Sequence, residues 1–149
     1  MQNPDAERRS FERHPIRVPL TVRPQHGGRE LFSEVGDLSE GGLSFACSEP
    51  MPEGSPLEVE LPVNDERFTL IAAVASCVEA AGSRTFRVGL AFANPGMRFR
   101  MKLAEQVLRI RELQRDLSRE RGAEVSLEEA AQRWVEQYAK IFADLYPKD

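Results

Sequence analysis

Two short clusters of polar residues in this chain have the types and spacing for binding chemistry. The first lies near the N-terminus and consists of Arg8, Arg9 and Arg13. A guanidinium donates hydrogen bonds from a rigid planar fork that suits phosphate oxygens, and its plane can stack on a purine. Three such groups on a flexible segment could close over a nucleotide. The alternative is a solvated charged tail, because Glu7 and Glu12 partly neutralise the run.

The second cluster, Asp37, Ser39 and Gly42, falls between two stretches that have the pattern of strands. A carboxylate and a hydroxyl can hydrogen-bond the Watson–Crick edge of a purine, and a glycine lets a ligand approach the backbone. The alternative is a plain turn, in which Asp37 and Ser39 hydrogen-bond local backbone amides. Taken alone, each cluster is better explained by its simpler alternative.

Together, in this order and with a predicted strand between them, the two clusters resemble the signature motifs of PilZ domains, RxxxR and (D/N)xSxxG. Five residues match these motifs: Arg9, Arg13, Asp37, Ser39 and Gly42. The segment 88–92, with the sequence VGLAF, is similar to the closing strand of that family. The resemblance covers roughly residues 7–95.

The resemblance implies a six-stranded antiparallel PilZ-type β-barrel that binds the second messenger cyclic di-GMP without turning it over. By analogy, Arg9 and Arg13 would contact the phosphates and stack on guanine. Asp37 and Ser39 would hydrogen-bond guanine, and Gly42 would keep the turn open. Both motifs are intact here, whereas some PilZ domains have lost them and act without the ligand.

Arg8 precedes the first motif, at a position where an arginine in this family tends to accompany an intercalated ligand dimer. The resemblance therefore leaves one or two ligand molecules per chain as alternatives. A flexible arginine segment would become ordered only when the dianionic ligand binds. Binding would then pull the N-terminus against the barrel and change the surface near both motifs.

Alternating apolar residues predict the β-rich domain that positions these clusters. Ile16, Val18, Leu20 and Val22 fall on one face of the first strand, with mostly polar residues on the other. Six strands are predicted, over residues 16–23, 31–38, 43–47, 57–63, 68–78 and 86–92. Turns rich in Gly, Pro, Asn and Asp separate them and no βαβ pattern is visible, which favours a small antiparallel barrel or sandwich.

From residue 96 the apolar period becomes helical and predicts two amphipathic helices. The first ends at Gly122, a residue type that favours helix termination. Ser126 and Glu129 form a capping box that opens the second helix, and Pro147 ends it. The stripe of the first helix consists of Leu103, Val107, Ile110, Leu113 or Gln114, and Leu117.

The apolar stripes of these helices have two alternative uses. They pack on each other and on the barrel, or one of them forms an interface, either a homodimeric coiled coil or a docking surface for a target protein. Trp134, Tyr138 and Phe142 are the candidate interface anchors, because large aromatic residues dominate interface energetics. The predicted organisation has three parts: a flexible segment 1–14 carrying RxxxR, a barrel 15–95 and a helical extension 96–149.

The composition narrows the class of protein. The 149 residues are 41% hydrophobic and 30% charged, as in a globular domain. No stretch approaches the roughly 18–20 apolar residues of a membrane span, and no signal-peptide core is present, so no membrane insertion and a cytoplasmic location are expected. The net charge of −4 argues against a nonspecific nucleic-acid binder, which needs a broad basic surface.

Catalytic and metal-binding chemistry have no evident residues in the sequence. Cys47 and Cys77 lack ligand or CxxC spacing and are expected to be buried, reduced thiols. His14 and His26 are isolated and are expected to be surface residues. Ser39 lacks the context of a nucleophile elbow. We therefore predict no catalytic residue, no metal and no cofactor beyond the cyclic di-GMP ligand, and we do not expect an enzyme.

The predicted function is a cyclic di-GMP receptor or adaptor that regulates motility, exopolysaccharide production, biofilm or virulence through an unidentified protein partner. The alternative is a ligand-independent interaction scaffold on the same barrel, against which the intact motifs argue. A small nucleic-acid-binding barrel is disfavoured by the acidic balance and by the lack of aromatic residues interleaved with basic ones along the strands.

Overall fold

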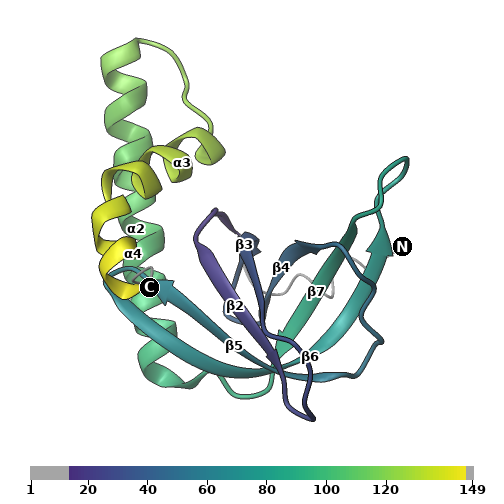
Figure 1. The fold of residues 1–149 in the computed structure, drawn as a ribbon. Helices are drawn as coiled ribbons and strands as arrows, with labels where there is room; N and C mark the ends of the chain where they lie inside the picture. Colours follow the sequence, from purple (N-terminus) through teal and green to yellow (C-terminus); the bar gives the residue numbers. More distant parts are fainter. Residues whose placement is uncertain (1–13, 147–149) are drawn as a thin grey trace, which may run out of the picture.

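The computed structural model describes residues 14–146 and shows a β-barrel with helices packed along one side (Figure 1). Within this part of the chain the strands are β1 (His14–Pro15), β2 (Pro19–Pro24), β3 (Leu31–Leu38), β4 (Gly42–Cys47), β5 (Pro56–Val63), β6 (Glu66–Glu79) and β7 (Phe86–Phe92). The helices that follow are α2 (Gly96–Arg121), α3 (Leu127–Gln137) and α4 (Ala139–Leu145). This is the mainly β fold with a C-terminal helical part that the sequence predicts.

The sheet closes on itself to form the barrel. Its strands are antiparallel, in the order β1-β3-β2-β5-β6-β7-β4, and an additional pairing of β3 with β4 completes the ring. Strands β2 to β7 form the six-stranded barrel. The short β1 pairs with the C-terminal end of β3, next to the part of β3 that pairs with β2. The chain from residue 14 to residue 24 therefore runs along one edge of β3.

The first predicted strand differs in its bounds from the observed one. The strand was expected to begin at Ile16, but β2 begins at Pro19 and the chain is irregular between β1 and β2. Ile16 and Val18 are nonetheless buried in the core, as their alternation predicts. The backbone link across this irregular part is the hydrogen bond from the Val35 N–H to the Val18 carbonyl, 2.9 Å long.

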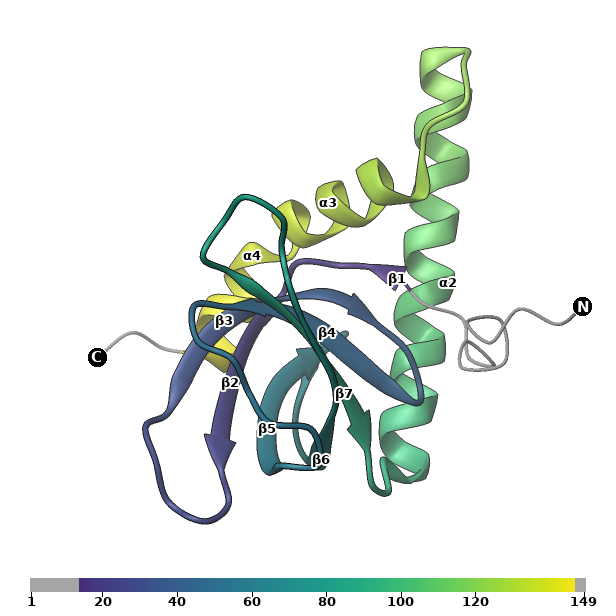
Figure 2. The same cartoon turned by 90° about the vertical axis from the view of Figure 1, so that its right-hand side faces the viewer.

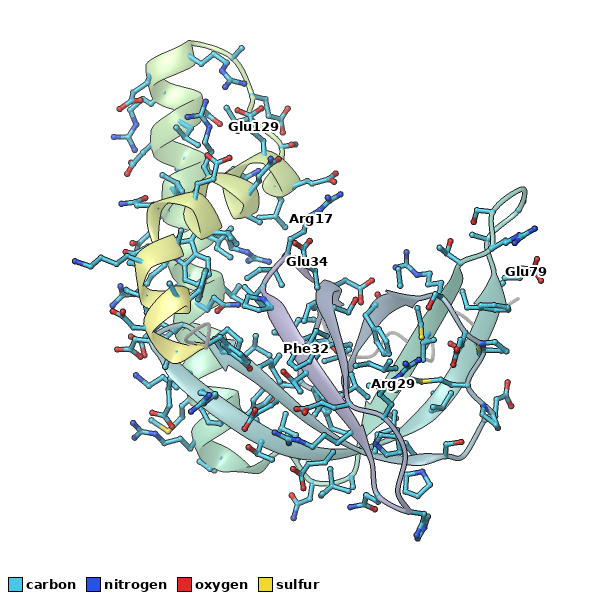
Figure 3. All side chains as sticks on the ribbon, viewed as in Figure 1. Arg17, Arg29, Phe32, Glu34, Glu79 and Glu129 are labelled. Carbon is cyan, nitrogen blue, oxygen red and sulfur yellow. The ribbon has the colours of Figure 1, made fainter. Side chains whose placement is uncertain are left out.

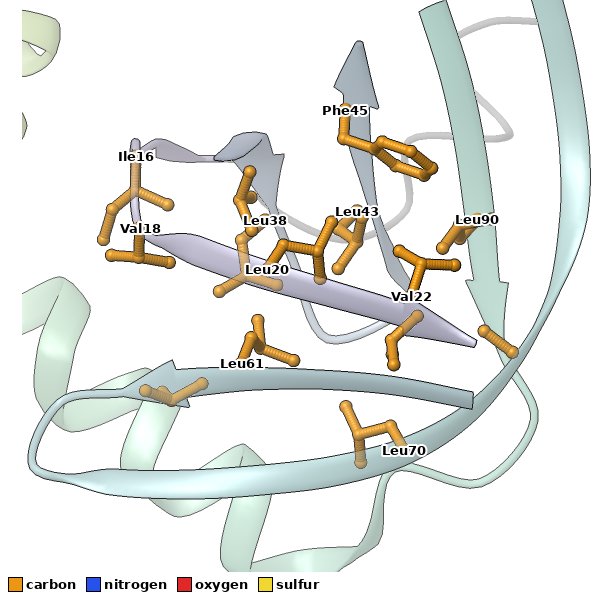
Figure 4. Close-up of a cluster of buried hydrophobic side chains, with 14 of the residues drawn as sticks. Ile16, Val18, Leu20, Val22, Leu38, Leu43, Phe45, Leu61, Leu70 and Leu90 are labelled. Carbon is orange, nitrogen blue, oxygen red and sulfur yellow. The ribbon is translucent and has the colours of Figure 1, made fainter. Parts of the chain in front are cut away.

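Period-two alternation determines which side chains fill the barrel. On β5, Leu57, Val59 and Leu61 are buried, while the intervening glutamates lie on the outer face. Figure 4 shows side chains from five strands converging in the interior: Leu20, Leu43, Leu61, Leu70 and Leu90. Burying one such side chain contributes about 1.5–3 kcal/mol relative to leaving it exposed, so this interior is a main source of stability.

Helix α2 shares the core of the barrel. Phe99 is fully buried, and its ring makes edge-to-face contacts with Phe68 of β6 and Phe92 of β7 at centroid distances of 5.5 and 5.3 Å. Leu103 and Ile110 are also buried. Figure 2 shows α2 standing beside the barrel and α3 crossing over β1, with the C-terminal half of α2 extending past the barrel. The intramolecular packing of the helical stripes is thus observed.

Polar contacts fasten α2 to the turn between β5 and β6. They are Asn64 N–H to Gln106 Oε1 at 2.6 Å, Lys102 Nζ to Asp65 Oδ1 at 2.8 Å, and Arg98 Nε to Glu66 Oε1 at 2.9 Å. The hydrogen bond from Lys102 lowers the pKa of Asp65, and that from Arg98 lowers the pKa of Glu66. Asn64 adopts a left-handed conformation with φ of 56°, which asparagine tolerates in tight turns.

The helical part contains one more break than the sequence predicts. The single second helix is divided into α3 and α4 at Tyr138, whose φ of −104° and ψ of 15° lie outside helical values. No proline or glycine lies at the break, so the sequence does not predict it. The break accompanies the packing of Trp134 against both Tyr138 and Phe142, at ring distances of 5.1 and 5.6 Å. Tertiary packing therefore overrides the continuous helical pattern.

The predicted helix ends at Gly122 and Ser126 are confirmed, whereas Pro147 lies outside the described residues. Gly122 caps α2 in a left-handed conformation, and its N–H donates to the Ser118 carbonyl at 3.0 Å. Ser126 caps α3, with its Oγ accepting from the Glu129 N–H at 3.0 Å. In the described residues no helix is long and apolar enough to cross a membrane.

Candidate functional site

The second motif lies where β3 turns into β4. Asp37 is the penultimate residue of β3, Ser39 is in the turn and Gly42 opens β4. A register shift between Val35 and Asp37 marks an irregularity in the β3–β4 ladder. The turn brings the motif residues together at one end of the barrel. The three side-chain positions nevertheless have different surroundings.

Ser39 faces the protein. It is 2% exposed, and its Oγ donates to the Gly42 carbonyl at 3.3 Å and accepts from the Gly41 N–H at 3.2 Å. Its own N–H donates to the same Gly42 carbonyl at 2.9 Å. The simpler alternative, a hydroxyl that stabilises the local turn, therefore describes Ser39 in this structure. A hydrogen bond from Ser39 to guanine would require the side chain to leave these partners.

Gly42 is required by the neighbouring strand. An ideal Cβ at this position would lie 1.9 Å from the carbonyl oxygen of Leu90 on β7, far inside van der Waals contact. The Phe92 N–H donates to the Gly41 carbonyl at 2.9 Å and holds the strands at this close approach. The space that a Cβ would need at position 42 is thus filled by the backbone of β7. That Gly42 also keeps the turn open for a ligand stays a prediction.

Asp37 faces outward and pairs with a residue that lies outside both motifs. Arg87 Nη2 on β7 donates to Asp37 Oδ2 at 2.9 Å and to Ser44 Oγ at 3.2 Å. The side chain of Asp37 is 18% exposed and that of Arg87 is 68% exposed. Sequence reasoning missed Arg87, because a charged residue at an outward position of a strand is ordinary. Only the strand register places it beside Asp37.

A row of small residues crosses three strands next to this ion pair. In the register, Asp37 of β3 pairs with Ser44 of β4, Ser44 with Gly89 of β7, and Gly89 with Ser76 of β6. No side chain in the row after Asp37 is larger than serine. The outer face of the sheet is therefore recessed here relative to the surrounding side chains. It forms a hollow of about 600 Å³ whose lining also includes Arg87. This volume lies within the roughly 300–1,000 Å³ of small-molecule sites.

A second hollow adjoins the first between the barrel rim and α3. Its volume is about 800 Å³, and it is lined by residues that include Arg17, Glu34, Arg87 and Gln132. Figure 3 shows Arg17 and Glu34 below α3. Arg87 and Ser44 line both hollows. The outer face of the barrel and the helical part therefore meet at one surface.

The first motif lies outside the described residues. Arg8, Arg9 and Arg13 all precede His14, where the described chain begins. The described chain begins with β1, which pairs His14 with Leu38 and Pro15 with Asp37 at the end of β3. The segment that carries the arginines thus joins the described chain beside the second motif.

The aromatic residues predicted as interface anchors pack within the chain. Trp134 is 2% exposed and Phe142 is 5% exposed, and both belong to the core shared by helices and barrel. Tyr138 is partly buried against the same core. Their intramolecular packing replaces the exposed anchor role in this structure. Of the cysteines, Cys47 is buried as predicted, whereas Cys77 is only half-buried; both are free thiols.

Metal-ligating groups do not gather in the described part of the chain. Among residues 14–146 no group of three or more His, Cys, Asp and Glu side chains is placed to hold a metal ion. The contacts of Arg87 with Asp37 and Ser44 show that the site offers hydrogen bonding and charge pairing.

The match to a family model decides the relationship. A model of the PilZ domain matches residues 7–109, which is more than half of the chain. The chain belongs to the PilZ domain family. A search of curated proteins returns no match.

Solved structures share the fold of this PilZ domain. YcgR from Escherichia coli in complex with c-di-GMP has a TM-score of 0.63 and 20% identity, and the match covers 76% of this chain and 50% of YcgR. The PilZ domain of the same protein gives 0.56 and 19%, covering 77% and 98%. MotI, an inhibitor of motility from Bacillus subtilis, gives 0.60 and 14%, covering 75% and 53%. This chain spans about half the length of MotI.

Proposed function

We propose that this PilZ domain is a receptor for cyclic di-GMP, which changes conformation on binding and acts on motility, exopolysaccharide production, biofilm or virulence through a partner protein. Family membership supports the ligand class, and the similar YcgR structure contains c-di-GMP. The description of MotI as an inhibitor of motility supports one of the outputs.

The observation that supports the proposal most directly is that β1, where the described chain begins, pairs with the end of β3 that carries Asp37. Asp37 is on the outer face, and its Cα pairs with that of Pro15 in β1. Arg13 directly precedes β1 in the sequence, so the RxxxR motif is adjacent in sequence to a strand that pairs with Asp37. Cyclic di-GMP carries two phosphates, which arginine forks recognise, and two guanines, which a carboxylate can recognise. The hollow lined by Arg87, the ion-pair partner of Asp37, and by Ser44 provides a surface for such a ligand.

The test is isothermal titration calorimetry of the whole chain with cyclic di-GMP. We expect saturable binding at micromolar concentration or below, and its loss in an Arg9→Ala/Arg13→Ala variant. Arg115→Ala/Arg119→Ala is the matched control, because it removes the same charge from exposed positions on α2. A stoichiometry near two ligands per chain, reduced to one by Arg8→Ala, would support the role proposed for Arg8. No binding by the wild type would refute the receptor function.

A ligand-independent scaffold is the second candidate, and one observation favours it. Ser39 and Gly42 have structural reasons to be present, since the hydroxyl holds the turn and the glycine admits the backbone of β7. Two of the three residues of the second motif are thus explained without a ligand. If the scaffold function is correct, Arg13→Ala will leave cellular function unchanged and calorimetry will detect no heat.

A further inference from the structure

Arg87 is a basic residue outside the motifs that the fold brings to the proposed site. Its Nη2 donates to both Asp37 Oδ2 and Ser44 Oγ. Its Nε and Nη1 make no hydrogen bond with any side chain or backbone group in residues 14–146. The side chain is 68% exposed. Arg87 is therefore oriented through one nitrogen and presents its other donors to the surface.

Arg23 provides a useful contrast on the same barrel. Its Nε, Nη1 and Nη2 each meet a different carboxylate, at 3.2, 2.8 and 3.1 Å. These partners are Glu30, Glu58 and Glu60. All three nitrogens of Arg23 are thus engaged within the protein, two of them with β5. Arg87 has one carboxylate partner in the described residues, and that partner belongs to the second motif.

The Asp37–Arg87 pair matches the hydrogen-bonding pattern of guanine. It presents carboxylate oxygens as acceptors beside guanidinium N–H donors. Guanine presents the inverse pattern, with N1–H and N2–H donors beside the acceptors O6 and N7, and arginine binds O6 and N7 in a bidentate manner. Adenine places the N6 donor where guanine has O6, so it would oppose the N–H groups of Arg87.

The charge and shape of the surroundings also favour a base over a phosphate at this position. Arg87 is paired with the carboxylate of Asp37, and a paired arginine attracts a phosphate less than an unpaired one does. The neighbouring residues Ser44, Gly89 and Ser76 leave a low surface on which a planar base could lie.

We infer that Arg87 contacts guanine and determines the selectivity of the site for guanine over adenine, with Asp37 and Ser44 as the residues that position it. The inference rests on the proposed cyclic di-GMP function and adds to it a residue that neither motif contains. A hydrogen-bonding pair of this kind discriminates between bases because the wrong base leaves donors facing donors.

The test compares three variants by calorimetry with cyclic di-GMP. Arg87→Ala is expected to weaken binding about ten- to a hundredfold, the range for loss of a bidentate contact with guanine. Arg87→Gln keeps an amide donor for O6 without the charge, and is expected to recover part of that loss. Arg84→Ala removes an exposed arginine from the β6–β7 turn and is the matched control, with a change of about twofold or less. Circular dichroism verifies that each variant is folded.

The outcomes separate this inference from the proposed function. If Arg9→Ala/Arg13→Ala abolishes binding but Arg87→Ala leaves it unchanged, the inference is wrong and the receptor function stands. Binding by Arg87→Gln as weak as that by Arg87→Ala would show that charge matters rather than base recognition, which also overturns the inference. No binding by the wild type removes both. The positioning role of Asp37 predicts that the losses in Asp37→Ala and Arg87→Ala are not additive in the double variant.

An independent test leaves Arg87 in place and fills the surface beside it. A Cβ at Gly89 would lie 2.6 Å from Ser76 Oγ but 3.8 Å from Ser76 Cβ, so Ser76→Ala removes the clash within the protein. Gly89→Val/Ser76→Ala is therefore expected to fold and to lose cyclic di-GMP binding by at least tenfold, while Ser76→Ala alone keeps it. Normal binding by the double variant would place the base elsewhere and overturn the inference.

Discussion

Replacing Gly42 by alanine is expected to weaken the barrel where β4 meets β7. The added Cβ would lie 1.9 Å from the Leu90 carbonyl oxygen and 3.3 Å from the Cα of Ala91. Carbon and oxygen atoms in contact remain about 3.4 Å apart, so β7 would have to withdraw by about 1.5 Å. The clash involves backbone rather than a rotatable side chain. A shift of that size breaks the 2.9 Å hydrogen bond from the Phe92 N–H to the Gly41 carbonyl.

The magnitude of the Gly42→Ala effect follows from two contributions. One or two lost ladder hydrogen bonds cost about 1 kcal/mol each, and overpacking typically costs about 1–3 kcal/mol. We therefore expect the free energy of unfolding to fall by about 2–5 kcal/mol, measured by urea denaturation followed by circular dichroism. The sum is large enough to be measured in a domain of ordinary stability.

The matched control for this prediction is Gly36→Ala on β3. A Cβ there would lie 3.2 Å from Ser44 Oγ, a hydroxyl that can rotate, so the loss should stay below about 1 kcal/mol. Equal losses in the two variants would refute the reasoning, because the close approach of β7 would then not be the reason for a glycine at position 42.

Three further predictions concern the helices and their contacts with the barrel. Phe99→Ala removes the ring between Phe68 and Phe92 and should lower the free energy of unfolding by about 3–5 kcal/mol in urea denaturation; a loss below about 1 kcal/mol would show that α2 is not part of the core. Ser126→Ala removes the cap of α3 and should cost about 1 kcal/mol, with Ser126→Gly closer to wild type in thermal denaturation; the opposite order would contradict the capping role. The pKa of Asp65 is lowered by its hydrogen bond from Lys102, so the folded chain binds fewer protons than the unfolded one. That stabilisation is present above the unfolded pKa near 3.9 and is lost as the pH falls through the lower folded value; Asp65→Asn should therefore lose less stability in acid, and urea midpoints that fall equally in both proteins would refute this.

The barrel could be predicted from the sequence because each strand encodes its own burial. Leu57, Val59 and Leu61 alternate with charged residues, and all three are buried as that period requires. The helix ends at Gly122 and Ser126 could also be predicted, because each residue caps its helix through a hydrogen bond to a residue close in sequence. The break at Tyr138 could not be predicted, because it accompanies ring packing that forms only in the folded chain.

The candidate site was predictable only where its residues belong to a motif. Asp37 was identified by its spacing from Ser39 and Gly42, and its outward position agrees with a binding role. Arg87 lies 50 residues from Asp37 in the chain, and nothing in its immediate sequence distinguishes it from other surface arginines. Its proximity to Asp37 results from the pairing of β3 with β4 and of β4 with β7. Such a residue can be found only when the register is known.

The residues of the (D/N)xSxxG motif therefore have separable tasks. Ser39 and Gly42 serve the turn and the contact between β4 and β7, so a barrel of this kind would keep them whether or not it bound a ligand. Asp37 has no comparable task in the core, because it lies on the outer face with Arg87. A receptor and a ligand-independent scaffold would consequently look alike at Ser39 and Gly42 and differ at Asp37 and Arg87. Variants at this outward pair, rather than at the rest of the motif, are the ones that can distinguish the two functions without unfolding the barrel.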